Sequence, residues 1–318
     1  MQIAEDARRS KYAVAKLGTN DKNRGILAIA DTLMAHADEI IAANRIDIEN
    51  GRAAGLNDGL IDRLMLDEKR IAGIAEGCRQ VAALPDPVGE VLWMHKRPNG
   101  LNIGQKRVPM GVIGIIYEAR PNVTVDAAVL CFKAGSACIL RGGKEAIRSN
   151  TAVVAALRAG LEHCGAPGTL VNLVEDTSRA SAAHLMEARG FVDLLIPRGG
   201  AGLIRACVAG ATVPCIETGT GICHVYVDES ADLSKALNIV ENAKASRPSV
   251  CNAEEVLLVH SAVAAEFLPR LKKRYICNNI WFRIILHSKR QCTIVLRSRS
   301  HLHTVCHFFL NHNCNTLD

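Results

Sequence analysis

Short apolar runs alternate with helical stretches over the middle of this chain, and this alternation constrains the fold more than any other feature. The apolar runs cover residues 111–116, 137–140, 170–174, 192–196, 213–216 and 224–227. Stretches with helical spacing lie between them, at residues 123–134, 145–163, 178–189, 200–209 and 232–245. Strands joined through helices pair in parallel by crossover connections. The sequence therefore predicts an α/β fold, with an open, mostly parallel sheet and helices on both faces.

The N-terminal part of the chain has a different pattern. Apolar side chains recur at helical spacing over residues 3–17, 22–54 and 57–84, which predicts three helical segments. Residues 90–107 then combine two short extended stretches with Asn99-Gly100, a pair that favours a tight two-residue turn. The sequence therefore predicts a hairpin between the N-terminal helices and the α/β region.

The C-terminal residues differ in composition from the rest. Residues 273–318 contain four cysteines, five histidines and no Gly, Ala, Pro, Glu or Met, and their Lys and Arg residues account for the formal net charge of +6. Residues 1–272 are neutral overall, which argues against nucleic-acid binding by this part. So abrupt a change indicates a segment foreign to the fold, such as the product of a shifted reading frame or a truncated gene. We expect poor order there.

The composition of this tail raises two specific functions, zinc binding and nucleic-acid binding. Residues 301–307 are rich in His and Cys, but the tail has no CxxC pair and no regular ligand spacing, which argues against zinc. Its charges form no continuous stripe, which argues against a nucleic-acid surface. No apolar run approaches the roughly 18 residues of a membrane span, and scattered single cysteines suit a reducing compartment. We expect a cytoplasmic protein without a metal, bound to neither membrane nor nucleic acid.

Cys251 is the candidate nucleophile. It lies in a polar, Pro-marked turn, Arg247-Pro-Ser-Val-Cys-Asn-Ala-Glu254, directly before the apolar residues 256–259. A reactive thiolate needs nearby positive charge, backbone amides and access for a substrate, and Arg247 and the amides around Asn252 can supply the first two. The alternative is that Cys251, like most free cysteines, is a packing residue.

Two glycine turns follow predicted strands and open predicted helices. One contains Gly199, Gly200 and Gly202, and the other contains Arg141 and Lys144 beside a Gly-Gly pair. Backbone amides at such junctions can bind a phosphate at the positive end of a helix. Neither turn is a full GxGxxG or Walker loop, and an isolated Gly-Gly turn is usually a tight connection. Two together favour a dinucleotide site.

Three further polar residues follow predicted strands. Glu217 ends one strand among small residues, where it can act as a base or an orienting group, or simply cap nearby amides. Arg120 and Asn122 follow the strand that ends at Ile116, so a guanidinium and an amide are available for an anion or an oxyanion. The alternative for Arg120 is an exposed ion pair.

These segments together resemble the gamma-glutamyl phosphate reductases of the aldehyde dehydrogenase superfamily. The resemblance is carried, in family order, by residues 108–126, 140–146, 195–204, 216–221 and 247–254, and it extends to about Leu271. It implies reduction of L-glutamyl 5-phosphate to L-glutamate 5-semialdehyde with NADPH, through a Cys thioester, in proline biosynthesis. It also implies a homo-oligomer, with glutamate 5-kinase as a further partner.

The resemblance assigns roles by position. Cys251 matches the nucleophile, and Glu217 matches the superfamily's strand-end glutamate. Lys144 occupies the position of an acid that holds a ribose 2′-hydroxyl in NAD-using relatives, which favours a 2′-phosphate and therefore NADP. The three glycines match the cofactor-phosphate turn, and Asn122 is assigned to the oxyanion site.

The resemblance also implies the domain organisation. Residues 1–222 would form the N-terminal helices and the NADP-binding α/β domain, residues 223–271 the beginning of a catalytic domain, and residues 272–318 the atypical tail. Arg120 or Arg247 would line the pocket for the leaving phosphate. Because family members continue with further catalytic residues and a dimerisation strand, we expect an incomplete catalytic domain, doubtful oligomerisation and little activity. Oxidation of free aldehydes and a non-catalytic remnant with a basic binding tail are the alternatives.

Overall fold

The computed structural model describes residues 2–217, 219, 221–248, 250–277, 281–287 and 291–297, with side-chain surroundings through Tyr275. The chain forms two compact units, Met1–Thr218 and Gly219–Asp318. We call them unit 1 and unit 2. In the described part of the chain, no helix is both long and apolar enough to cross a membrane.

A parallel four-stranded sheet forms the centre of unit 1. Its strands are β3 (Val112–Tyr117), β4 (Ala137–Arg141), β5 (Val171–Leu173) and β6 (Leu194–Arg198). They pair in the order β5-β4-β3-β6, so β3 is central, and every residue of β3 is buried. Near-continuous apolar runs are typical of parallel strands covered on both faces. The predicted α/β fold with a mostly parallel sheet is confirmed.

Helices connect these strands and cover the sheet. They are α6 (Pro121–Lys133), η1 (Lys144–Ala146) with α7 (Ile147–His163), η2 (Gly168–Leu170), α8 (Arg179–Met186) and α9 (Ala201–Gly210). The chain steps from β3 to β4 to β5 in one direction and then returns to β6 on the other side of β3. Because such crossovers are right-handed, this reversal places α8 on the face opposite α6 and α7. The reversal also creates the switch point at which open α/β sheets bind ligands.

The N-terminal helices extend the core on the side of α6 and α7. They are α1 (Gln2–Val14), α2 (Thr19–Ala35), α3 (Ala37–Ala53), α4 (Asp58–Leu64) and α5 (Glu68–Ala83). Helix α2 packs against α5 and α7, and its Ile26, Ile29 and Leu33 are buried. The segments predicted at 22–54 and 57–84 each contain a break, at His36 and before Asp67. The second break is stabilised by the Asp67 carboxylate, which caps α5 by accepting a hydrogen bond from the Arg70 amide at 2.7 Å.

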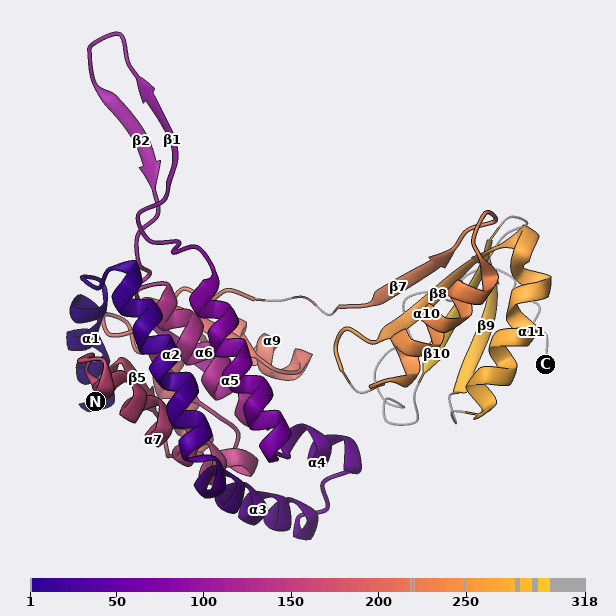
Figure 1. Cartoon of the computed structure of the whole chain (residues 1–318), viewed down its shortest axis with the longest axis horizontal. Helices are drawn as coiled ribbons and strands as arrows, with labels where there is room; N and C mark the ends of the chain where they lie inside the picture. Colours follow the sequence, from indigo (N-terminus) through magenta and orange to yellow (C-terminus); the bar gives the residue numbers. More distant parts are fainter. Residues whose placement is uncertain are drawn as a thin grey trace. The chain divides into compact units, whose positions relative to one another are not determined.

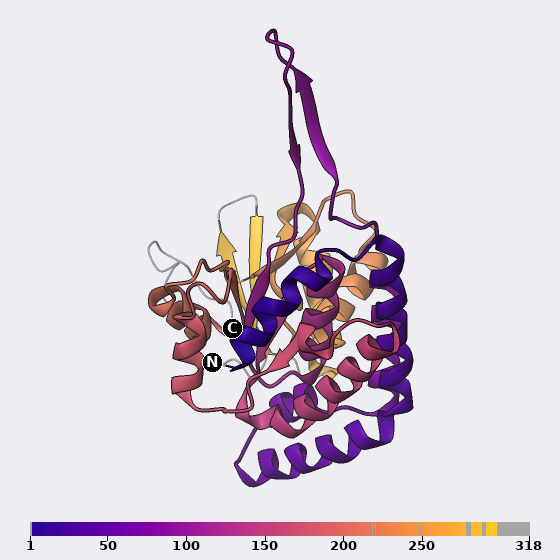
Figure 2. The same cartoon turned by 90° about the vertical axis from the view of Figure 1, so that its left-hand side faces the viewer.

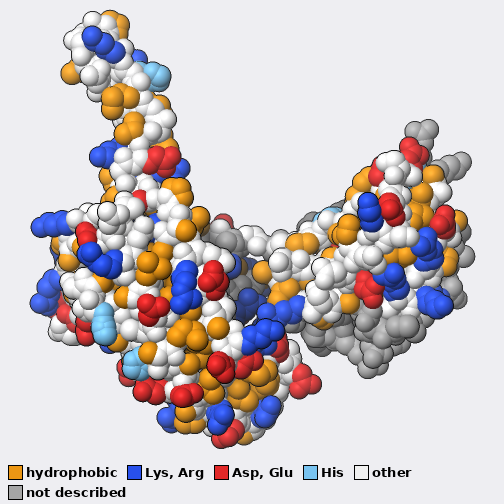
Figure 3. Space-filling model, viewed as in Figure 1, with side chains coloured by type: hydrophobic (Ala, Val, Ile, Leu, Met, Phe, Trp, Pro, Cys, Tyr) orange, Lys and Arg blue, Asp and Glu red, His pale blue; other side chains and the backbone are white. Residues whose placement is uncertain are grey.

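A hairpin extends from unit 1, as Figures 1 and 2 show from two sides. Strand β1 (Val91–Lys96) pairs antiparallel with β2 (Asn102–Lys106), and every residue of both strands is exposed. Gly100 has a φ of 89°, which accounts for the predicted turn at Asn99-Gly100. Apolar side chains are exposed along and beside this hairpin (Figure 3): Val91, Leu92, Trp93, Met94, Leu101, Ile103 and Val108.

The strand predicted at 213–216 is wrong as a full strand. Only an isolated parallel bridge joins Leu195 of β6 to Cys215. The Leu195 amide donates to the Pro214 carbonyl, and the Ile216 amide donates to the Leu195 carbonyl. Pro214 has no amide hydrogen to extend the pairing, which explains why an apolar run yields a single bridge here.

Unit 2 has its own sheet and core. Strands β7 (Cys223–Val227) and β8 (Glu254–His260) pair in parallel, and β10 (Gln291–Arg297) pairs antiparallel with both β8 and β9 (Trp281–His287). Helices α10 (Leu233–Ala245) and α11 (Ser261–Cys277) pack against each other and β8, burying Leu237, Phe267 and Tyr275. Thus the apolar run at 224–227 belongs to this second sheet.

The described part of the C-terminal segment has regular backbone. Helix α11 continues to Cys277, and residues 281–287 and 291–297 form β9 and β10. The poor order expected after residue 272 stays a prediction. The His- and Cys-rich fragment at 301–307 lies outside the described residues.

Candidate functional site

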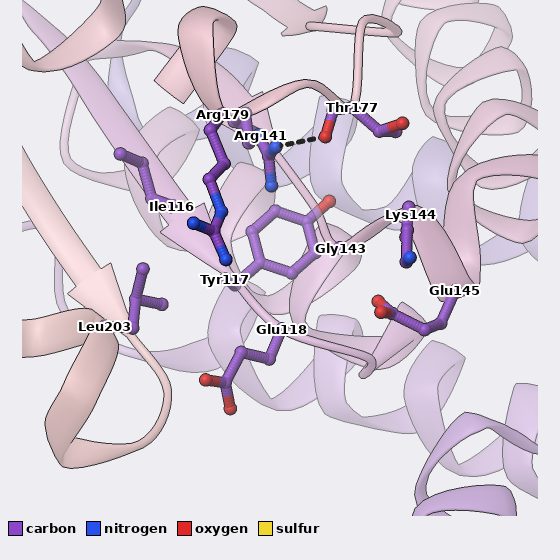
Figure 4. A pocket seen from close by; sticks show the side chains of 10 residues that line it. All are labelled: Ile116, Tyr117, Glu118, Arg141, Gly143, Lys144, Glu145, Thr177, Arg179 and Leu203. Carbon is purple, nitrogen blue, oxygen red and sulfur yellow. Dashed lines mark hydrogen bonds between the residues drawn. The ribbon is translucent and has the colours of Figure 1, made fainter. Parts of the chain in front are cut away.

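A cavity of about 400 Å³ opens at the carboxyl ends of the strands of unit 1 (Figure 4). Its lining comes from the ends of β3 and β4, the loop after β5 and the helix after β6: Ile116, Tyr117, Glu118, Arg141, Gly143, Lys144, Glu145, Thr177, Arg179 and Leu203. Parallel strands bring their following loops to one edge of the sheet, so residues distant in sequence meet here. A volume of this size suits part of a small organic ligand.

Tyr117 forms the rigid floor of the cavity. Its side chain is 1% exposed, and its hydroxyl lies 2.8 Å from the Thr124 hydroxyl of α6. Thr124 in turn donates to the Asn150 side-chain oxygen of α7 at 2.9 Å. Burial raises the pKa of Tyr117 well above its ordinary value of 10.0, so its hydroxyl stays neutral. This buried network fixes the ends of β3, α6 and α7 relative to one another.

The Gly142-Gly143 turn passes very close to this network. A Cβ built on Gly142 would lie 2.2 Å from the Asn150 side-chain nitrogen and 3.1 Å from the Tyr117 ring. A Cβ on Gly143 would lie 2.5 Å from a carboxylate oxygen of Glu145. Packing therefore disfavours any larger residue at Gly142, whereas the near contact at Gly143 is the end of a flexible side chain that can move. The Gly-Gly pair noted in the sequence lets the backbone lie against the cavity floor.

Arg141 lines the cavity, and its guanidinium is engaged by the protein. It donates to the Thr177 carbonyl at 2.7 Å, to the Ser178 carbonyl at 2.8 Å and to the Gly142 carbonyl at 3.1 Å. These bonds attach the loop after β5 to the end of β4. Arg141 thus positions this loop, and its predicted contact with the cofactor stays a prediction.

Arg179 is a lining residue that the sequence interpretation did not select. It is the first residue of α8, whose N-cap is Ser178: the Ser178 hydroxyl accepts from the Ser181 amide, and Asp176 accepts from both the amide and the hydroxyl of Ser178. In Figure 4 its guanidinium extends into the cavity, with Lys144 on the other side of the Tyr117 ring. The sequence signal was present, since a capped helix start follows a predicted strand there.

The turn that contains Gly199, Gly200 and Gly202 leads into α9. Gly200 is the N-cap residue and has no side chain to offer, so the amides of this helix end are available to an external anion. In the structure the Glu118 carboxylate accepts from the Gly200 amide at 3.2 Å. A Cβ on Gly199 would lie 2.7 Å from the Glu118 carboxyl carbon. A carboxylate thus occupies the place where the sequence predicts a cofactor phosphate.

The other predicted residues of unit 1 lie at strand ends and at the start of α6. Arg120 is the N-cap residue of α6, and the Asn122 side chain donates to Asp126 at 3.2 Å. Glu217 follows the bridge at Cys215 and is exposed. The Asn122 amide is therefore oriented within its own helix. None of these three residues is among those that line the cavity.

Cys251 and Arg247 belong to unit 2. Cys251 is the second residue of a tight turn in which the Ala253 amide donates to the Val250 carbonyl at 3.2 Å. Of the eight cysteines whose side-chain surroundings are described, it is the one that is exposed. Burial raises the pKa of the Cys207 and Cys215 thiols in unit 1. Exposure in a turn fits a nucleophile better than a packing role.

A buried carboxyl group lies three residues after this cysteine. Glu254 is 1% exposed, and neither of its side-chain oxygens has a hydrogen-bond partner in the described structure. Burial raises its pKa from 4.5 to about 8, against the opposing charge of Lys244. Lys244, itself buried, donates to the Glu254 backbone carbonyl at 2.8 Å and to Glu255 at 3.1 Å. Glu254 is therefore largely protonated at neutral pH.

Comparison with known proteins places these features. Residues 1–278 match the aldehyde dehydrogenase family. Gamma-glutamyl phosphate reductase from Neisseria meningitidis is 56% identical over 274 residues, which cover 86% of this chain and 65% of that protein. The same-named protein from Carboxydothermus hydrogenoformans is 53% identical over 283 residues, covering 89% and 68%. The crystal structure of gamma-glutamyl phosphate reductase from Thermotoga maritima aligns with a TM-score of 0.78 at 44% identity, over 88% of this chain and 67% of that one.

The chain matches only part of the length of these relatives. The chain spans 65% of the length of the two N. meningitidis relatives.

Proposed function

This chain belongs to the aldehyde dehydrogenase family and, within it, to the gamma-glutamyl phosphate reductases, and from that premise we propose that it reduces L-glutamyl 5-phosphate to L-glutamate 5-semialdehyde. The family implies a nicotinamide cofactor and a small-molecule substrate. The observation that carries the proposal is the cavity beyond the strands of unit 1, with glycine turns and basic side chains at its edge.

The residues around this cavity fit a dinucleotide. The Gly200 amide at the start of α9 donates to a carboxylate, which supports the proposal that this helix end binds an anion, and the Gly142-Gly143 turn lies at the edge of the cavity. Lys144 and Arg179 would hold a 2′-phosphate, and this is the basis for proposing NADP over NAD. Glu145 suits a ribose hydroxyl. When bound, the cofactor supplies the hydride.

Cys251 would perform the covalent step. Its thiolate attacks the acyl carbon of the mixed anhydride, phosphate leaves, and a thioester forms on the sulfur. Reduction gives a thiohemiacetal, which collapses to the aldehyde and returns the thiolate. Arg247 is four residues from Cys251 in the same unit and would support the departing phosphate. Glu217 and Asn122 remain the proposed orienting base and oxyanion donor.

The reverse reaction provides the test, because it distinguishes this reductase from an enzyme that oxidises free aldehydes with water. The sequence predicts little activity, so we expect NADPH to form slowly from L-glutamate 5-semialdehyde and NADP⁺, and only when inorganic phosphate is present. Cys251→Ser should abolish it while cofactor binding persists. NADPH formation that is independent of phosphate, or unchanged in Cys251→Ser, would contradict the proposal.

A further inference from the structure

A second thiol lies beside the turn that holds Cys251. Cys223 begins β7, is half-buried, and its thiol lies 3.8 Å from the Cys251 backbone carbonyl oxygen, within range of a weak S–H···O hydrogen bond. Both residues belong to unit 2, so this proximity is internal to one compact unit. Neither the nucleophilic step nor cofactor binding uses Cys223.

Strand pairing fixes this proximity. Strands β7 and β8 are parallel neighbours, with Cys223 opposite Glu254, and Cys251 precedes Glu254 by three residues. A carbonyl oxygen lies about 2.4 Å from its own Cα, so the Cys223 sulfur is within about 6 Å of the Cys251 Cα. A disulfide joins Cα atoms that are about 4.4–6.8 Å apart. Because a cysteine sulfur lies about 2.8 Å from its own Cα, the two Cα atoms are no more than about 9 Å apart, and the turn must shift to bring them into bonding range.

The local structure also permits the remaining movement. Cys251 occupies a solvent-exposed tight turn closed by one backbone hydrogen bond, between Ala253 and Val250. Strand β7 pairs only with β8 among the described strands, and Cys223 is its first residue. Strand ends and turn residues move more readily than a sheet interior. A rotation of the turn would bring the Cys251 sulfur towards Cys223.

We propose that Cys223 is a resolving cysteine for Cys251, so that the pair forms a reversible disulfide under hydrogen peroxide. The Cys251 thiolate is oxidised by peroxide to a sulfenic acid with release of hydroxide. The Cys223 thiol then attacks that sulfur, the S–O bond breaks, an S–S bond forms and water leaves. A reducing dithiol restores both thiols and is itself oxidised.

This pairing would protect the exposed thiol. A sulfenic acid without a neighbouring thiol proceeds to sulfinic acid, which common thiol reductants do not reverse. The disulfide stops that progression while withdrawing the sulfur from acyl transfer. The loss of acyl transfer rests on the proposed function, whereas formation of the disulfide does not.

Peptide mapping tests the pairing directly on the full chain. After peroxide treatment and blocking of free thiols, cleavage at glutamate isolates Cys223 between Glu217 and Glu229, and Cys251 between Glu241 and Glu254. Wild type is expected to give these two peptides as one disulfide-linked species that separates on addition of dithiothreitol. In Cys223→Ser, Cys251 should instead accumulate as sulfinic acid, with at least about tenfold less thiol recovered by the reductant.

Cys164→Ser is the matched control. Cys164 is also half-buried, and its thiol also donates to a carbonyl, that of Leu161 at 3.0 Å. This variant should form the Cys223–Cys251 disulfide as wild type does. Absence of the linked species from wild type, or equal recovery of the Cys251 thiol in wild type and Cys223→Ser, would overturn the inference. A protein that forms the disulfide but lacks phosphate-dependent NADPH formation would overturn the proposed function alone.

Discussion

At the residue scale, the charged side chains that line the cavity determine which ligands it accepts. Lys144 and Arg179 offer positive charge, and Glu118 and Glu145 offer negative charge. Glu118 already accepts a hydrogen bond from the Gly200 amide, and the third cationic lining residue, Arg141, is bonded to backbone carbonyls. Recognition of a 2′-phosphate would therefore depend on Lys144 and Arg179, whereas the negative charge of Glu145 would repel the phosphate.

Replacement of Arg179 should weaken the preference for NADPH. A hydrogen bond to a charged group contributes about 1.5–3 kcal/mol, so in Arg179→Ala we expect the ratio of the NADH to the NADPH dissociation constant to fall at least about tenfold. Fluorescence titration with the two nucleotides measures this ratio. Arg205→Ala, on α9 and away from the cavity lining, should leave it unchanged. If Arg179→Ala leaves this ratio unaltered, residues other than Arg179 distinguish NADPH from NADH.

Glu118 should compete with the cofactor for the start of α9. Its carboxylate must leave the Gly200 amide before a phosphate can occupy that position, and like charges near one helix end repel. If the Glu118 carboxylate weakens the binding free energy of NADPH by about 1 kcal/mol, Glu118→Gln should bind NADPH about fivefold more tightly. Calorimetric titration checks the prediction, and weaker binding would show that Glu118 instead supports the site.

At the scale of elements, the turn between β4 and η1 is fixed by what lies beneath it. Asn150 of α7 and Tyr117 of β3 leave no room for a side chain on Gly142. Packing of α7 and β3 against this turn therefore explains why the turn contains glycine at position 142. Similarly, Arg141 at the end of β4 holds the loop after β5, and Ser178 and Asp176 set the start of α8.

Gly142→Ala should lower both stability and cofactor affinity. Its Cβ would displace the Asn150 amide or the backbone, and overpacking of this kind costs about 1–3 kcal/mol. Urea unfolding measures the loss. Gly73→Ala is the control, because Gly73 lies within α5 and a Cβ built there has no atom within 4 Å. Alanine at this position should raise the free energy of unfolding by at most about 1 kcal/mol. Equal stability of Gly142→Ala and wild type would contradict the predicted clash.

Glu254 at the start of β8 should make stability depend on pH. Its pKa is about 8 in the folded protein and 4.5 ordinarily, so between these values the unfolded chain releases a proton that the folded chain keeps. Stability is therefore full below about pH 4.5, falls as pH rises and levels off above about pH 8. Glu254→Met, which removes the buried carboxyl, should flatten the profile and raise the denaturant midpoint at pH 8. A wild-type midpoint that rises over this range, after comparison with Glu254→Met, would contradict the assignment.

At the scale of the whole molecule, the exposed hairpin is the feature most suited to association. The family resemblance implies a homo-oligomer for the intact family and leaves it doubtful for this chain; if a second copy binds, the exposed apolar side chains of the hairpin are the surface that it would cover. If wild type associates in sedimentation experiments, we expect Met94→Glu, at a position 60% exposed, to shift the protein to a lower oligomeric state. Ile239→Glu on α10, 58% exposed, should not. An unchanged state in Met94→Glu would exclude this face as the main interface.

Several features of the fold and site were predictable from sequence because their causes are local. Apolar periodicity located the four strands of the first sheet, Asn99-Gly100 located the hairpin turn, and the glycine pairs located the strand-to-helix junctions. The order of motifs led to the family that the comparisons confirm. Element boundaries were less accurate: a helix predicted across residues 22–54 is divided at His36, and Pro214 reduced a predicted strand to a bridge.

The sequence by itself determined the alternating elements, the glycine positions and the exposed-turn context of Cys251, because each depends on residues close together in the chain. Tertiary structure decided which side chains are available for binding: it engaged Arg141 with loop carbonyls, brought Arg179 and Lys144 to one cavity, and placed Glu118 on the Gly200 amide. It also brought Cys223 to Cys251. These choices depend on strand order and close packing between distant segments, and a residue's type alone does not encode them.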